Sequence, residues 1–403
     1  MGDGGAAPRI AMVAPEPFVP PTSGGQLRMT QHFSVLRRVG CRVQAAVLVD
    51  HTHPFARHDP EGAIHIFPVS AASPTTRLGE LARGVLLRRH PRTFTLHAAM
   101  QRALESTKAW KPDLVLLEYS LLATFLPEVR RTFPGVPVIV DAHNAEATLL
   151  AEIARASGGL RGRMENRMRA WWFRRIEGVM VPRADEVWAA SEADAAALRA
   201  MGSHRVRVIP NAVDTDAYAP ASEAGQDVLV FTGTMDYPPN IDGAEWLCRG
   251  ILPAVRRKVP GIHLYLVGKS ATRVAPLAGP GVTVTGMVAD PRRYFAQATV
   301  VVVPLRVGSG TRLKILEALA MQKAVVTTRV GCQGLDIRDE THVLIADNAE
   351  AFARAVLRAL RDAELRRRLG EAGRRLVEER YSWNAAARII PSTLVGSLLA
   401  AVR

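Results

Sequence analysis

A glycine loop between two apolar runs holds the residues of this chain best suited to binding an anion. Residues 299–303 are mostly branched and apolar and are closed by Pro304, which is typical of a strand buried on both faces. The loop 307–311 (Val-Gly-Ser-Gly-Thr) follows, then apolar residues at helical spacing from Leu313, then a second apolar run at 324–328. The pattern predicts a strand, a loop, a helix and a strand, and the free backbone N–H groups at such a helix start favour an anion.

Three charged residues accompany this loop. Arg312 and Lys314 are expected in the first helical turn, where cations oppose the helix dipole, so a bound anion explains them better than helix stability does. Glu317 lies about a turn and a half further in, where its carboxylate can accept hydrogen bonds from two vicinal hydroxyls, as a ribose presents. The alternative is a tight turn with solvated charges, and it stays open because the loop is not a full dinucleotide fingerprint.

Two further groups stand where ligands bind in open α/β sheets, at strand ends and helix starts. The predicted strand 136–140 ends in Asp-Ala-His-Asn-Ala-Glu, which places His143 in a polar cluster. Gly24 and Gly25 precede a helix expected at about 26–39. A structural histidine and a flexible turn remain the alternatives at these two places.

Alternating strand and helix patterns run through both halves of the chain. Strands are predicted at 9–14, 42–49, 64–69, 113–117, 136–140, 185–190 and 206–210, and again at 228–231, 263–267, 282–285, 299–303, 324–328 and 342–346. A basic helical pattern is expected between about 75 and 110, and a helix at about 241–258. This pattern predicts an α/β protein of two doubly wound domains facing each other across a cleft.

The composition limits the class of protein. A chain of 403 residues with 48% hydrophobic residues can form two domains with full cores. We see no apolar run of the roughly 18 residues that a membrane span needs, and no secretion signal at the N-terminus. Cys41, Cys248 and Cys332 are far apart and form neither a zinc pattern nor a disulfide framework. We therefore expect a cytoplasmic protein without a metal site.

The charge is strongly positive. A net charge of +14 favours anionic partners, although an arginine-rich composition can also reflect a GC-rich genome. Residues 160–177 combine six arginines with Met164, Met168 and a Trp171-Trp172 pair, which is the composition of a helix that lies on an anionic membrane. The alternative is a helix packed on its own domain with a solvated basic face. The arginines at 366–368 and 374–375 are expected to form such a face.

The run PLRVGSGTRLKILEALAMQKAVVTTRVGCQGL resembles the donor-binding core of the retaining glycosyltransferases of family 4, which have the GT-B fold. In that family the second Glu of a Glu–seven residues–Glu motif holds the ribose of the nucleotide, and Glu317 matches it. The first Glu falls on Ser309, so the group that contacts the donor sugar differs here. Asn211-Ala212-Val213-Asp214 resembles the family's sequence at the domain crossover.

The resemblance also carries over to the first domain and to the loop after the strand 228–231. Gly24 and Gly25 match a glycine pair beside the donor phosphate and the acceptor, with Arg28 nearby, and His143 matches a histidine that contacts the transferred sugar, with Asn144 and Glu146 beside it. Family members often clamp the diphosphate with an Arg and a Lys after that strand, where this chain has Thr234 and Asn240. The resemblance thus implies His143, Arg312 and Lys314 as catalytic residues, and it implies donor contacts from Gly24, Gly25, Gly233, Thr234, Arg306, Gly308, Ser309, Gly310, Thr311 and Glu317.

The predicted protein is a retaining glycosyltransferase that moves a sugar from a UDP- or GDP-sugar to an acceptor hydroxyl in polysaccharide or glycolipid assembly. We expect a first domain at 1–210, a nucleotide-sugar domain at 211–382 and a helix at 383–403 that packs back on the first domain. No cofactor, metal or nucleic-acid partner is expected, and the protein is placed in the cytoplasm, with contact at the inner membrane face left open. The alternatives are a sugar-nucleotide epimerase or hydrolase of GT-B fold and a non-enzymic basic membrane- or nucleic-acid-binding protein.

Overall fold

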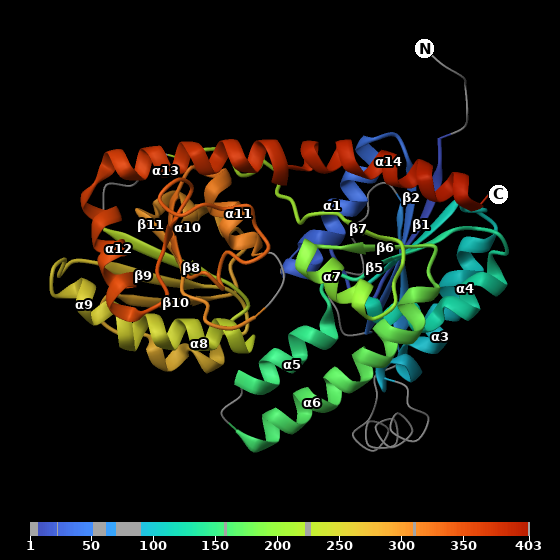
Figure 1. The fold of residues 1–403 in the computed structure, drawn as a ribbon, viewed down its shortest axis with the longest axis horizontal. Helices are drawn as coiled ribbons and strands as arrows, with labels where there is room; N and C mark the ends of the chain where they lie inside the picture. Colours follow the sequence, from blue (N-terminus) through green and yellow to red (C-terminus); the bar gives the residue numbers. More distant parts are fainter. Residues whose placement is uncertain are drawn as a thin grey trace, which may run out of the picture. The chain divides into compact units, whose positions relative to one another are not determined.

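A computed structural model describes residues 7–21, 23–50, 62–69, 90–156, 159–221, 227–308 and 312–401. The chain divides into two compact units, which are described separately (Figure 1). Unit 1 contains residues 1–210 and 387–403, and unit 2 contains residues 211–386. Each unit is built on one parallel sheet, which confirms the predicted α/β class.

Unit 1 has a seven-stranded sheet in the order β3-β2-β1-β4-β5-β6-β7, with every pair of neighbours parallel. The central strands are fully buried because both faces are covered by helices, as their continuous apolar runs predict. The strands are β1 (Arg9–Ala14), β2 (Arg42–Asp50), β3 (Ile64–Val69), β4 (Leu114–Glu118), β5 (Val138–Asp141), β6 (Glu186–Ala189) and β7 (Val206–Val208). The α-helices are α1 (Gly24–Arg38), α3 (Arg92–Lys108), α4 (Leu126–Thr132), α5 (Glu146–Ala156), α6 (Leu160–Arg175) and α7 (Glu192–Ala200), with the greater part of α14 (Trp383–Ala401).

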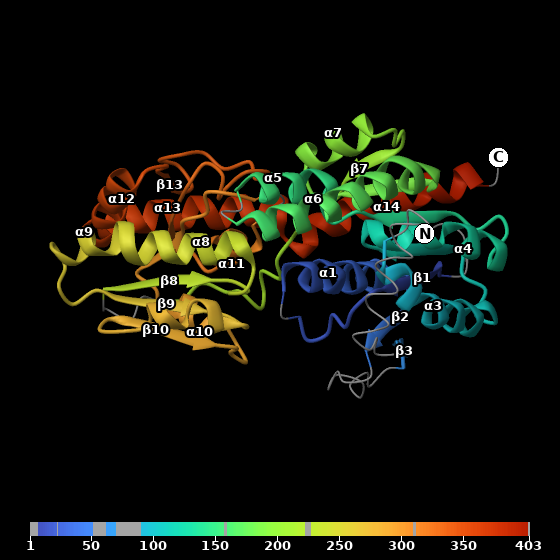
Figure 2. The ribbon, with the colours of Figure 1, turned by 90° about the horizontal axis from the view of Figure 1, so that it is seen from below.

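Unit 2 has a six-stranded sheet in the order β10-β9-β8-β11-β12-β13, again parallel throughout. Figure 2 shows α8 and α9 on one face of this sheet and α10 on the other. The strands are β8 (Val228–Thr232), β9 (His263–Val267), β10 (Val282–Gly286), β11 (Val300–Val303), β12 (Ala324–Thr327) and β13 (Leu344–Ile345). The α-helices are α8 (Pro238–Trp246), α9 (Leu252–Arg256), α10 (Arg292–Gln297), α11 (Leu313–Ala320), α12 (Ala349–Arg361) and α13 (Ala363–Leu376).

Three predicted helix boundaries differ from the structure. Helix α1 begins at Gly24, so the two glycines form its first turn instead of preceding it, and Ser23 accepts a hydrogen bond from the backbone of Gln26. Arg312 is the N-cap of α11 and has extended backbone, because the helix starts one residue later. The helix expected at 241–258 is divided by a π-helical turn at Leu247–Ile251. The basic stretch at 75–89 lies outside the described residues, and α3 follows it.

Among the described residues, no helix combines the length and the apolar character needed to cross a membrane.

Candidate functional site

The carboxyl edge of the unit 1 sheet carries two buried acids and two strained residues. Glu118 is the last residue of β4 and Asp141 is the last residue of β5, so the parallel sheet places their side chains at one edge. Tyr119 and His143 follow within two residues of these strand ends and have positive φ angles of 74° and 58°. Non-glycine residues adopt this conformation only where the surrounding contacts fix it, and such residues gather at functional sites.

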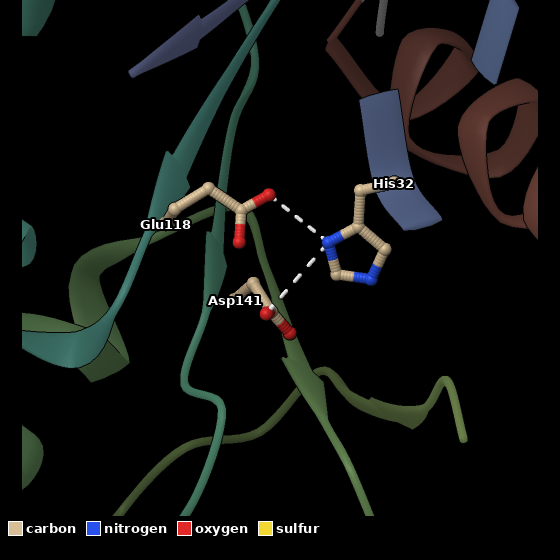
Figure 3. A group of neighbouring side chains, drawn as sticks. All are labelled: His32, Glu118 and Asp141. Atoms are coloured by element: carbon tan, nitrogen blue, oxygen red, sulfur yellow. Dashed lines mark hydrogen bonds and ion pairs between the residues drawn. The ribbon is translucent and has the colours of Figure 1, made fainter. Parts of the chain in front are cut away.

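Two residues of α1 complete a buried ionic network with these acids. Figure 3 shows Nδ1 of His32 facing both carboxylates, 3.0 Å from Oε1 of Glu118 and 3.8 Å from Oδ2 of Asp141. Arg28 donates to both oxygens of Asp141, over 2.7 Å and 2.5 Å. His32, Glu118 and Asp141 lie close enough together to hold a metal ion, but the Arg28 guanidinium already occupies Asp141. The contacts therefore describe an internally balanced ion-pair network, and the expected independence from metal stays a prediction.

Burial decides the charges in this network. Burial, opposed by the hydrogen bond with His143, raises the pKa of Glu118 to about 7. Burial also lowers the pKa of His32 to about 3, helped by the nearby Arg28. Burial works against the ionised form of Asp141 as well, but the Arg28 guanidinium outweighs it and holds the pKa of Asp141 well below its usual range. At neutral pH the network thus contains an ionised Asp141 paired with Arg28, a neutral His32, and a Glu118 near its midpoint.

His143 is held by this network through one ring nitrogen. Its Nε2 lies 2.8 Å from Glu118 and 3.1 Å from Asp141, so this nitrogen carries the hydrogen. Nδ1 is buried and has no hydrogen-bond partner among the described residues. Tyr119 stacks on the imidazole with ring centroids 3.8 Å apart. A Cβ added to Gly25 would lie 1.8 Å from the Tyr119 hydroxyl and 3.5 Å from Nδ1, so only glycine lets α1 approach this closely.

The helix that follows His143 is already capped by side chains of unit 1. Glu177 accepts hydrogen bonds from the backbone N–H groups of Glu146 and Ala147, at 2.8 Å and 3.0 Å. Asp194 accepts from the N–H of Ala145 at 3.0 Å. The carboxyl groups of Glu177 and Asp194 therefore fill the start of α5, where an external phosphate would otherwise be favoured.

The carboxyl edge of the unit 2 sheet is basic instead. Lys314 lies in the first turn of α11, and its ammonium donates to Oδ1 of Asn240 at 2.8 Å and lies 4.5 Å from the centre of the Phe231 ring. Burial lowers the pKa of Lys314 to about 7, with a further contribution from Arg312, and the Glu317 carboxylate only partly offsets the loss of hydration. Asn240, one of the two residues that replace the family's usual clamp, thus places a lysine that comes from a different helix.

Two glycines allow this basic edge to form. A Cβ on Gly233 would lie 2.7 Å from the Asn240 amide nitrogen and 2.8 Å from Nζ of Lys314. Gly308 has a φ of 117°, and a Cβ there would lie 2.9 Å from the buried Arg312 guanidinium. The backbone thus comes close to both cations, which is the arrangement that phosphate-binding loops use.

Glu317, the predicted ribose acceptor, is buried on the same helix. Its Oε1 accepts a hydrogen bond from the Tyr218 hydroxyl at 2.9 Å. Burial raises the pKa of Glu317, and the Tyr218 hydrogen bond and the Lys314 charge partly counter that rise.

The other predicted donor residues differ in position. The carbonyl of Thr234 accepts a hydrogen bond from Asn240 at 2.8 Å, so Thr234 belongs to the Lys314 cluster. Arg306 is half exposed, and its guanidinium already pairs with Asp242. Ser309, Gly310 and Thr311 lie outside the described residues. Gly24 is exposed at the start of α1 in unit 1.

Several residues of these two edges were not identified from the sequence. Glu118 stood at a predicted strand end, which is the only signal it gave, and His32 and Tyr218 gave none. Asp141 was placed in the polar cluster of His143 without a role. Their contacts join segments far apart in the chain, which pattern analysis does not pair.

Helix α6 presents a second surface in unit 1. Trp172 is buried, whereas the side chains of Leu160, Met164 and Trp171 are exposed by 74%, 63% and 42%. These three positions fall on one side of a helix with 3.6 residues per turn. Exposed arginines accompany this apolar stripe at positions 161, 163, 167, 174 and 175.

Comparisons with known proteins cover most of the chain. Residues 23–212 match the family model "Glycosyl transferase 4-like domain", and residues 226–362 match "Glycosyl transferases group 1". An uncharacterised 44.6 kDa protein in the cps region of Klebsiella pneumoniae is 22% identical over 139 residues, which cover 32% of this chain and only 36% of that relative.

Solved structures with similar folds extend over nearly the whole chain. Sucrose-phosphate synthase from Thermosynechococcus elongatus has a TM-score of 0.71 at 22% identity, covering 98% of this chain and 100% of that one. HepE from Anabaena, crystallised with UDP and glucose, has a TM-score of 0.69 at 14% identity, covering 96% and 99%. These likenesses identify the GT-B fold, as predicted.

Proposed function

The chain belongs to the group 1 glycosyltransferases of GT-B fold, and from that premise we propose that it is a retaining enzyme acting on a nucleoside-diphosphate sugar. The observation that carries the proposal is the pairing of a partly buried cation, Lys314, with a buried acceptor, Glu317, on one turn of α11. In this proposal the diphosphate binds to the Lys314 ammonium, and the ribose hydroxyls donate hydrogen bonds to the Glu317 carboxylate. The structure of HepE with UDP supports a uracil nucleotide, with guanine as the other candidate.

In the proposed reaction the acceptor oxygen forms a bond to the anomeric carbon while the bond from that carbon to the diphosphate oxygen breaks. The electron pair of the broken bond goes to the diphosphate, and the acceptor proton passes to the same leaving group on the same face of the sugar, which retains the configuration. Lys314 and Arg312 stabilise the negative charge that grows on the diphosphate. Such electrostatic stabilisation is usually the largest contribution to catalysis. His143 binds a sugar hydroxyl through Nδ1, while Glu118 and Asp141 hold its ring.

An epimerase would need a carboxylate pair that reaches the substrate. Glu118 and Asp141 are two neighbouring acids, but they are not placed to reach a substrate. Both are fully buried, and Arg28 donates hydrogen bonds to both oxygens of Asp141. This favours transfer over epimerisation.

The acceptor is proposed to be presented at an anionic membrane surface, as in the assembly of a polysaccharide or glycolipid. Support comes from α6, where exposed Leu160, Met164 and Trp171 lie beside arginines, the arrangement of helices that rest on anionic lipid. Sedimentation with phosphatidylglycerol vesicles, but not with phosphatidylcholine vesicles, is the expected result. It should be lost when Arg163, Arg167 and Arg174 become Gln and kept when the exposed Arg354, Arg358 and Arg367 become Gln; equal loss in both variants would contradict a specific role of α6.

The donor site is tested by thermal unfolding with UDP, GDP, ADP, dTDP and their sugars. One diphosphate should raise the melting temperature of the wild type, since a ligand that binds only the folded state stabilises it. Glu317→Ala should abolish the shift, and the exposed Glu350→Ala should keep it. If no nucleotide shifts the wild type, with or without candidate acceptors, the proposed donor site is wrong.

A further inference from the structure

Glu317 is held by a residue from the segment that opens unit 2. Asp214 organises this segment, because its Oδ1 accepts hydrogen bonds from the N–H groups of Asp216 and Ala217, and its carbonyl accepts from the N–H of Tyr218 at 2.9 Å. The resulting turn directs the Tyr218 ring towards Phe295, with centroids 6.5 Å apart, and the hydroxyl to Glu317.

One arginine fixes the same turn to the helix that carries Glu317. Arg374 of α13 donates to the carbonyl of Tyr218 at 2.7 Å, to that of Thr215 at 3.1 Å, and to that of Ala320 in the last turn of α11 at 2.6 Å. Its side chain is only 13% exposed, so it is not part of the solvated face expected at 374–375. Arg374 thus ties the backbone of Tyr218 to that of Ala320, three residues after Glu317 on α11, which limits how far Tyr218 and Glu317 can move apart.

Resting on the proposed donor site, we propose that Tyr218 is a positioning residue for nucleotide binding. Its hydroxyl donates a hydrogen bond to Oε1 of Glu317, and this contact orients Oε2 towards the ribose hydroxyls. A buried carboxylate without such a donor adopts other rotamers or becomes protonated, and either change removes the acceptor that a ribose needs. Burial and the Glu317 charge raise the pKa of the Tyr218 hydroxyl, so it stays protonated and donates.

The hydroxyl also helps keep Glu317 ionised. The charged or titratable groups that act on Glu317 are Lys314 on the same helix and Tyr218 from the turn, and Arg374 lies at the last turn of α11. Removing the hydroxyl takes away a contact that lowers the pKa of Glu317, so the carboxyl takes up its proton at a higher pH. The affinity of a Tyr218→Phe variant for the nucleotide should then fall below that of the wild type by a factor that grows as the pH falls.

The test is calorimetric titration of UDP, GDP and ADP into wild type and Tyr218→Phe, followed by the 2′-deoxy counterpart of the tightest binder. We expect Tyr218→Phe to weaken the ribonucleotide about tenfold, the change expected for one hydrogen bond to a charged group. We also expect it to reduce the preference for ribose over deoxyribose, and to bind more weakly relative to the wild type as the pH is lowered. Tyr265→Phe, which removes a hydroxyl from β9 of the same unit, is the matched control and should bind as the wild type does.

The outcomes separate this inference from the proposed function. If the wild type binds none of the three diphosphates, the donor site itself is wrong. If the wild type binds and Tyr218→Phe binds equally well at every pH, the positioning role is wrong. A loss of the same factor for ribose and deoxyribose, unchanged by pH, would show that the hydroxyl acts only on packing and would also overturn it.

Discussion

The carboxyl edges of the two sheets differ in how their buried charges are balanced. In unit 1 the Arg28 guanidinium pairs with the Asp141 carboxylate, and Glu118, whose pKa is raised to about 7, lies against His32 and His143. In unit 2 two cations, Arg312 and Lys314, accompany the single carboxylate of Glu317 on α11, and the ammonium of Lys314 meets a neutral amide and an aromatic ring. The same fold thus provides one edge whose buried charges are paired and one edge at which we propose that an anion binds.

This difference assigns separate tasks to the two edges. A balanced, fully buried network is rigid and suits the orientation of one side chain, His143. Loss of hydration disfavours the charged form of Lys314, as its lowered pKa indicates, and the diphosphate of the proposed donor would favour that form. We therefore propose that unit 2 recognises the leaving group and that unit 1 supplies a fixed histidine.

Asp141→Asn should have the largest effect, and on stability. The substitution leaves the Arg28 guanidinium buried without its counterion, which typically costs about 3–5 kcal/mol of unfolding free energy. Urea unfolding followed by circular dichroism measures the change, with the surface pair variant Asp185→Asn as the control, since its partner Arg130 is 44% exposed. Equal midpoints for the two variants would mean that the unit 1 network is not balanced as described.

Lys314→Met should have the opposite effect: a large loss of turnover without a loss of stability. It removes a cation that is costly to bury, so the melting temperature should not fall, while turnover should fall about 10²–10³-fold through lost stabilisation of the leaving diphosphate. Arg306→Met is the matched control and should cost less than about threefold, because its guanidinium is half exposed and already paired with Asp242. Similar losses of turnover in the two variants would indicate that Arg306 contacts the diphosphate as closely as Lys314 does, and would contradict the role proposed for Lys314 alone.

The local sequence pattern was sufficient to predict the fold, but it identified only some of the residues at the carboxyl edges of the two sheets. The apolar runs placed every described strand to within a few residues, because a parallel strand buried on both faces has a continuous apolar sequence. His143, Lys314 and Glu317 could be picked out because each stands beside a strand end or a glycine loop. The pairings could not be predicted, since Arg28 and Asp141 are 113 positions apart and Tyr218 and Glu317 are 99 apart, and contacts at such distances depend on the packing of whole helices.

The pH dependence of donor binding gives a smaller and more selective test of the comparison. Lys314 has a pKa of about 7 in the free protein, so it is charged below that pH and neutral above it. Affinity for the diphosphate should fall up to about tenfold per pH unit above pH 7, where the terminal phosphate has already lost its last proton. Lys314→Arg keeps its charge throughout this range and should remove the decline, if the larger guanidinium still reaches the phosphate. In unit 1, Glu118 also titrates near pH 7, so a decline that persists in Lys314→Arg but disappears in Glu118→Gln would transfer anion recognition to the edge that we describe as balanced.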